Sequence, residues 1–176
     1  MQCAIAVIAA LLLIPVPAAA AAPARPDDRV AIDACLRAAQ DNPARCIGTV
    51  YTPCSETPTG STTAGMGECA GRETQVWSDM MEENFRALLA GPLGQTQAQP
   101  WNRPAENRRD RPVPGTDILN DMQQTWLVWR AKKCDTLAMQ AEGGTLSRVL
   151  YGICAYEETG RQALWLKSLV DDAKAR

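Results

Sequence analysis

The cysteines constrain what this chain can fold into more than any other residue type. Seven cysteines occur in 176 residues, and the sequence contains no histidine. Cys3 lies in an N-terminal stretch that we expect to be removed. Six cysteines then remain: Cys35, Cys46, Cys54, Cys69, Cys134 and Cys154. An even number in a short exported chain predicts three disulfides, although fifteen connectivities are possible.

The N-terminal stretch has the features of a secretion signal. Residues 4–16, AIAVIAALLLIPV, form an uncharged apolar run that is too short for a comfortable membrane span. The small residues that follow offer cleavage sites after Ala20 to Ala22. A buried helix is the alternative interpretation, and the terminal position argues against it. We therefore predict a signal peptide over 1–22 and a periplasmic or secreted mature protein without a membrane span.

The composition argues against several functional classes. Without histidine or a CxxC pair a zinc site is disfavoured, and the histidine-dependent catalytic triads and dyads are absent. The 18 basic and 20 acidic residues give a net charge of −2, which provides no reason to expect nucleic acid as a partner. The acidic pairs Glu82-Glu83 and Glu157-Glu158 are interpreted as solvated helix faces. We predict a non-catalytic protein without metal or cofactor.

Apolar residues recur at helical spacing along most of the mature chain. Helices are predicted over 26–40, 68–92, 117–140 and 145–156, with a last one after Thr159. Residues 46–66 are predicted to be a loop, and the longest strand-like stretch is IGTVY, 47–51. The predicted fold class is all-α.

The ends of these helices carry recognisable signals. Asp27 or Asp28 is predicted to cap the first helix, and Gly91 followed by Pro92 is predicted to end the second. Thr145 is predicted to cap the fourth helix. For the last helix, Thr159 and Gln162 match the spacing of a capping box.

Two glycines predict a helical hairpin. Cys134 lies nine residues before Gly143, and Cys154 lies ten after Gly144. Two antiparallel helices that turn at this diglycine would bring the two cysteines level. A bridge between them would close a loop of about 20 residues and stabilise the fold by roughly 3 kcal/mol.

The stretch TWLVWRAKKC, 125–134, places two tryptophans three residues apart on the predicted third helix. Its inward face is predicted to comprise Leu119, Met122, Trp126, Trp129 and Lys133 or Cys134. We interpret the two tryptophans as core residues, with a binding platform as the alternative. A reactive thiol at Cys134 is disfavoured, because no CxxC motif accompanies it.

Four segments in order resemble the LprI-like lysozyme-inhibitor family: GECAGRETQVWSDMMEENFRALL, ILNDMQQTWLVWRAKKC, EGGTLSRVLYGIC and TGRQALWL. The positions that match the family pattern are Cys69, Phe85, Leu88, Gln124, Trp126 or Trp129, Arg130, Cys134, Gly143, Gly144, Cys154, Thr159, Arg161 and Leu164. The resemblance covers about 54–169. It implies a small exported helical domain, and the family is named for inhibition of lysozyme by a member.

The chain departs from the family pattern in two places. The connection over 91–115 is longer than usual, and the region with Cys35 and Cys46 is additional. We therefore divide the chain into a signal peptide (1–22), an N-terminal helix with a cysteine-rich loop (23–53) and an LprI-like domain (54–176) that carries the 91–115 insert. The expected molecule is a small disulfide-stapled helical bundle with a long loop rich in proline and arginine.

The resemblance makes a protein partner, and specifically a lysozyme, the best named target. In the 91–115 loop, an aromatic side chain and four cations could anchor in a lysozyme cleft and bind its carboxylates: Trp101, Arg103, Arg108, Arg109 and Arg111. A solvated linker is the alternative interpretation of this loop. For the whole protein, the alternatives are an accessory cell-envelope module that binds another periplasmic protein or the cell wall, and a carrier of a small ligand.

Overall fold

A computed structural model describes residues 23–98 and 112–175, and the predicted signal peptide therefore lies outside the described residues. The described residues form the following elements: α1 (Pro26–Ala38), the 3-10 turn η1 (Pro43–Cys46), α2 (Tyr51–Ser55), α3 (Thr63–Ala90), α4 (Pro92–Gln95), β1 (Gln97–Ala98), β2 (Val113–Pro114), α5 (Gly115–Ala138), the 3-10 turn η3 (Met139–Ala141) and α6 (Leu146–Lys174). The prediction of an all-α disulfide-stapled bundle is confirmed.

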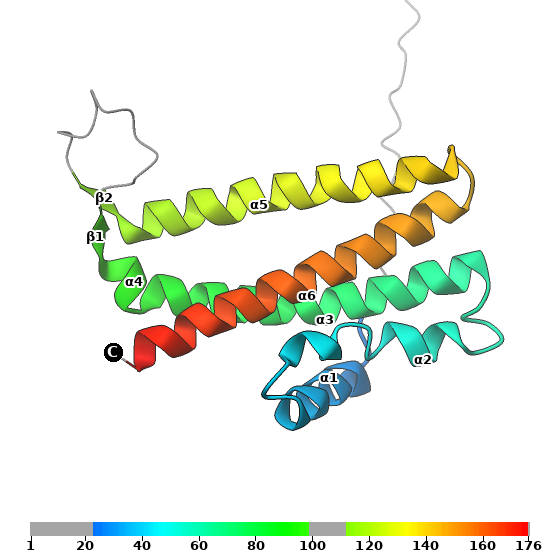
Figure 1. Cartoon of the computed structure of the whole chain (residues 1–176), viewed down its shortest axis with the longest axis horizontal. Coiled ribbons are helices and arrows are strands. Elements are labelled where there is room, and N and C mark those ends of the chain that lie inside the picture. Colours follow the sequence, from blue (N-terminus) through cyan, green and yellow to red (C-terminus); the bar gives the residue numbers. More distant parts are fainter. Residues whose placement is uncertain (1–22, 99–111, 176) are drawn as a thin grey trace, which may run out of the picture.

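Three long helices dominate the molecule (Figure 1). Helix α6 crosses α3 near its middle and pairs with α5 through a tight hairpin, while α1, η1 and α2 lie along the side of α3 away from α5. A short antiparallel pair, Gln97 with Pro114 and Ala98 with Val113, joins α4 to α5. Across the described ranges, no helix is both long and apolar enough to span a membrane.

The hydrophobic core lies where α3 and α6 cross and α1 covers them. Trp77 of α3 and Leu166 of α6 are fully buried there, together with Ile32 of α1 and Cys46 of η1. Residues 23–53 therefore complete the same core as the rest of the described chain and do not build one of their own.

The starts of the first helices differ from the prediction. Arg25 occupies the cap position of α1, and Asp28 acts from the third helical position by accepting a 2.8 Å hydrogen bond from the Arg25 amide. The predicted loop over 46–66 was wrong in part, because it contains η1's last residue, α2 and the start of α3. Thr62 caps α3 by accepting a 3.0 Å bond from the Gly65 amide.

The predicted break near Thr159 was wrong, because α6 runs unbroken from Leu146 to Lys174. The Thr159 hydroxyl donates to the Ala155 carbonyl oxygen of its own helix at 2.6 Å, so it does not cap a new one. Gly160 follows in close contact with the core, where an added Cβ would lie 2.9 Å from Ile47. At the start of α6, Thr145 holds the cap position without a side-chain hydrogen bond.

The hairpin predicted from the diglycine is present. Helix α5 continues through η3 and turns back at Glu142 and Gly143, whose φ angles of 48° and 80° lie in the left-handed region that glycine adopts readily. Cys134 and Cys154 are level across the hairpin and bridged, with Cα atoms 5.4 Å apart. The other bridges are Cys35–Cys46 and Cys54–Cys69.

One of the two tryptophans on α5 is not a core residue. Trp126 is half-buried against the core, but Trp129 is 46% exposed, and the prediction for Trp129 was wrong. Because α5 packs mainly against α6, it buries only a narrow stripe that includes Gln123 and Cys134. Trp129 lies beside that stripe, and the Lys133 ammonium is 5.0 Å from its ring centre.

Candidate binding surfaces

The end of the α5–α6 hairpin is an exposed projection. We define the hairpin tip as residues 135–148, which begin directly after Cys134; none of them is buried. Three large apolar side chains are exposed on it: Leu137 (36%), Met139 (73%) and Leu146 (48%). The tip contributes little to the core, yet the Cys134–Cys154 disulfide fixes its base. An exposed apolar projection held in one conformation is suited to binding a partner, because less conformational entropy is lost on association.

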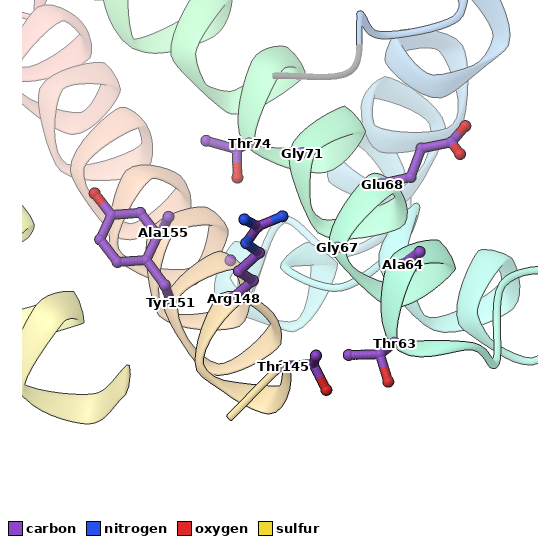
Figure 2. A pocket seen from close by; sticks show the side chains of 11 residues that line it. Thr63, Ala64, Gly67, Glu68, Gly71, Thr74, Thr145, Arg148, Tyr151 and Ala155 are labelled. Atoms are coloured by element: carbon purple, nitrogen blue, oxygen red, sulfur yellow. The ribbon is translucent and has the colours of Figure 1, made fainter. Parts of the chain in front are cut away.

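A groove lies beside the tip, between the first half of α6 and the first half of α3 (Figure 2). Its volume is about 670 Å³, in the range of ligand and peptide clefts. Helix α3 contributes small side chains at three- and four-residue spacing: Ala64, Gly67, Gly71 and Thr74. Helix α6 contributes the opposite wall, with Arg148, Tyr151, Gly152 and Ala155.

Gly67 is a glycine that the packing of this chain does not require. It lies inside α3, where glycine costs about 1 kcal/mol relative to alanine. A Cβ built on Gly67 would meet nothing within 4 Å. By contrast, a Cβ on Gly152 would lie 2.9 Å from the Cβ of Ala70, so that glycine allows α6 to approach α3. Gly67 therefore keeps the groove open without serving the fold.

Arg148 gives the groove its charge. Its guanidinium reaches from α6 toward the turn of α3 at Gly71, whereas the Glu68 side chain points away from the groove (Figure 2). Glu68 instead faces Arg25, with the two side chains 3.8 Å apart. Among the described residues, no side chain forms an ion pair with Arg148. The groove thus combines an apolar lining with an uncompensated cation.

Arg130 links the two helices of the hairpin. It donates a 2.8 Å hydrogen bond to the Thr159 hydroxyl, and its guanidinium carbon lies 5.2 Å from the centre of the Trp126 ring. Burial lowers the pKa of Arg130, although an arginine remains charged at neutral pH. Its Nε is buried without a hydrogen-bond partner in the described part of the chain. These contacts assign Arg130 a packing role between α5 and α6.

Charged residues flank this contact on the surface. Glu158 accepts from Lys133 at 2.9 Å and from Arg161 at 2.5 Å, and Arg161 also donates to Glu157 at 3.2 Å. The interpretation of Glu157-Glu158 as a solvated pair was wrong for Glu158, which is buried. Its burial is possible because two cations, Lys133 and Arg161, both donate to its Oε1.

Two buried carboxylates on the other side of α3 hold the N-terminal segment. Glu73, which is fully buried, accepts hydrogen bonds from the amides of Gly48, Val50 and Tyr51 and from the Trp77 indole. Arg72 donates to Asp28 at 2.5 and 3.0 Å. Burial alone would raise the pKa of Asp28, but the hydrogen bonds from Arg72 and the Arg25 amide and the charge of Arg72 outweigh it and hold the pKa below its usual range. Both carboxylates are satisfied within the protein and serve its structure.

The contact residues predicted in the loop, Trp101, Arg103, Arg108, Arg109 and Arg111, lie outside the described residues. The motif residues Arg130, Gly143 and Gly144 are present in the hairpin, but the groove residues Gly67, Arg148 and Tyr151 were missed. The small residues at three- and four-residue spacing from Ala64 to Thr74 were a signal that could have indicated a groove. Nothing in the sequence indicated which helix would lie opposite them.

The described residues give no support for metal binding, since they contain no group of three or more histidine, cysteine or acidic residues placed to hold an ion. The acidic pair Glu82-Glu83 is divided between separate arginine partners, Arg86 for Glu82 and Arg29 for Glu83. The tip and the groove could therefore bind a partner through their shape, their apolar side chains and the charge of Arg148.

The sequence also matches a model of a known protein family. The family model described as lysozyme inhibitor LprI matches residues 54–166, which include α3, α5, the hairpin tip and most of α6. No curated protein and no solved structure matches the chain.

Proposed function

Because this chain belongs to the LprI lysozyme-inhibitor family, we propose that it is an exported, non-catalytic protein that binds and inhibits a lysozyme. The family match over 54–166 is the observation that carries the proposal, since it spans both the hairpin tip and the groove. The three disulfides fit a location outside the cytoplasm, where such bonds persist. The periplasm or the extracellular space is the location that we propose.

The hairpin tip suits this function physically. A lysozyme binds its glycan substrate in a cleft that contains catalytic carboxylates, and an inhibitor can act by filling that cleft. The tip is an exposed projection with Met139 and Leu146 as apolar contacts and a disulfide at its base. A net charge of −2 also favours encounter with a basic lysozyme. The 91–115 loop, with Trp101 and its arginines, remains a second proposed contact.

The experiment is a titration of the oxidised mature protein into lysis assays with c-, g- and i-type lysozymes. We expect one class to be inhibited stoichiometrically. Met139→Asp and Leu146→Asp should each weaken inhibition about tenfold or more, because a charge would replace an apolar contact. Val30→Asp is the matched control, since Val30 is a similarly exposed apolar residue on α1.

Two results would change the conclusion. Equal inhibition by the tip variants and the wild type would remove the tip from the interface while leaving the inhibitor function in place. No inhibition of any class at large excess would contradict the function itself. The protein would then be interpreted as an accessory envelope module, and its partner would be sought by pull-down from periplasmic extract.

A further inference from the structure

We propose that the groove between α3 and α6 receives an apolar segment of the bound lysozyme that carries one carboxylate, and that this carboxylate pairs with Arg148. This inference rests on the proposed function, and it identifies the surface and the chemistry of the contact. The groove is lined by small side chains on α3 and by Arg148 and Tyr151 on α6 (Figure 2).

The charge of the groove selects an acidic occupant. Arg148 is an exposed residue whose side chain reaches across the groove toward α3, and no acidic side chain of the described chain pairs with it. Glu68, the one acidic residue that lines the groove, is directed toward Arg25. A guanidinium in such surroundings binds a carboxylate through charge-assisted, often bidentate hydrogen bonds. A basic segment of the partner would instead be repelled by the Arg148 guanidinium.

The size of the groove suits one face of a helix of the partner, or an extended segment of it. The volume of about 670 Å³ accommodates several side chains but not a whole helix. Gly67 leaves the backbone of α3 uncovered at a position where a side chain would meet nothing. Such a stretch allows the backbone of a partner segment to approach closely, as in the recognition of helices by apolar grooves.

The groove and the hairpin tip can engage one partner together. Thr145 lines the groove and also belongs to the tip, so the two surfaces are continuous. If the tip occupies the substrate cleft of a lysozyme, the adjoining groove would meet the part of the lysozyme surface next to that cleft. We therefore assign the acidic segment to the cleft rim.

The test uses two groove variants of the full mature chain. Gly67→Leu fills the groove, and Arg148→Gln removes its charge. Dissociation constants are measured by calorimetry against the lysozyme class that the wild type inhibits, and thermal melts confirm that each variant folds. We expect each variant to bind at least tenfold more weakly, with the melting temperature of Gly67→Leu equal to or above that of the wild type, since leucine favours helix more than glycine.

Matched controls separate the groove from general effects. Ala87→Leu places the same leucine side chain at an exposed position of α3, about 30 Å from Gly67 along the helix. Arg86→Gln removes an exposed arginine of the same helix, whose only ion pair in the described part is with Glu82. Both controls should bind within twofold of the wild type.

The outcomes distinguish the two proposals. If the wild type binds lysozyme and both groove variants bind equally well, the groove proposal is overturned and the inhibitor function stands. If Gly67→Leu weakens binding but Arg148→Gln does not, the acidic contact is overturned. If no lysozyme binds the wild type, both proposals fail together.

Discussion

At the scale of single residues, the acid–base behaviour of Asp28 yields a prediction about stability. Its carboxylate is buried against Arg72, whose hydrogen bonds and charge hold the pKa of Asp28 below its usual range despite the burial. A carboxyl whose pKa is lowered on folding stabilises the protein above its unfolded pKa, and this stabilisation is lost as the pH falls through the folded value. The free energy of unfolding should therefore decrease as the pH is lowered from about 4 toward 2.

Asp28→Asn tests this prediction. The variant should lose about 3 kcal/mol at pH 7, because Arg72 is left buried without its partner. Its stability should then fall less steeply than that of the wild type below pH 4, as measured by urea unfolding at a series of pH values. Asp172→Asn, at an exposed position of α6, serves as the control. Parallel pH profiles for wild type and Asp28→Asn would show that this pair does not contribute to acid sensitivity.

Single residues also show where sequence-based prediction fails. Glu73 lies on the buried face of α3, one turn before Trp77. Its partners, however, are amides of 48–51, about 25 residues earlier, and these contacts order a segment that has no periodicity of its own. The local structure of 46–55 depends on this long-range contact, so the sequence alone indicated a loop.

At the scale of elements, the hairpin was predicted because its signals are local. A diglycine and two cysteines at matched distances determine the turn and the bridge. The false break at Thr159 has the opposite cause. A threonine followed three residues later by glutamine matches a capping box, but the Thr159 hydroxyl is engaged by Ala155 and Arg130 inside a continuous helix. A capping signal predicts a helix start only where the side-chain hydroxyl is not already hydrogen-bonded to other groups.

The disulfide at the base of the tip leads to a prediction for this element. Replacing both Cys134 and Cys154 with alanine should lower the free energy of unfolding by about 3 kcal/mol, because the bridge closes a loop of 20 residues. Helix content should be retained, since Arg130–Thr159 and Lys133–Glu158 still join α5 to α6. Circular dichroism and urea unfolding measure both effects.

A matched pair of variants separates stability from binding. The alanine variant of Cys35 and Cys46 should also be less stable. On the proposed inhibitor function, its inhibition of lysozyme should equal that of the wild type, because this bridge joins α1 to η1 away from the tip. The variant of Cys134 and Cys154 should inhibit more weakly. Equal inhibition by the two double variants would argue that fixing the tip is unimportant for binding.

At the scale of the whole molecule, the N-terminal segment is part of the folding unit. Ile32 and Cys46 belong to the core around Trp77, and the amides of Gly48, Val50 and Tyr51 satisfy Glu73. A chain shortened to 54–176 would expose Trp77 and leave the Glu73 carboxylate without its three backbone amide donors. We expect it to be strongly destabilised, with red-shifted tryptophan fluorescence and increased binding of a hydrophobic dye. A cooperative unfolding transition equal to that of the mature chain would show that 54–176 folds independently.

The fold class, the long helices and the hairpin could be predicted from the sequence, because periodicity and turn residues act locally. The candidate surfaces could be predicted only in part. Arg148 and Gly67 are 81 positions apart, and their meeting depends on how α6 crosses α3, which no local pattern encodes. The exposure of Trp129 likewise depends on α5 packing mainly against one neighbour.

The disulfide pattern has a consequence for how the protein matures. Each bridge joins a cysteine to the next one along the mature chain: 35 to 46, 54 to 69 and 134 to 154. If the chain is exported as proposed, an oxidase that links cysteines in their order along the chain would produce the native set directly. We therefore expect the yield of native protein to depend on the supply of oxidant rather than on a disulfide isomerase.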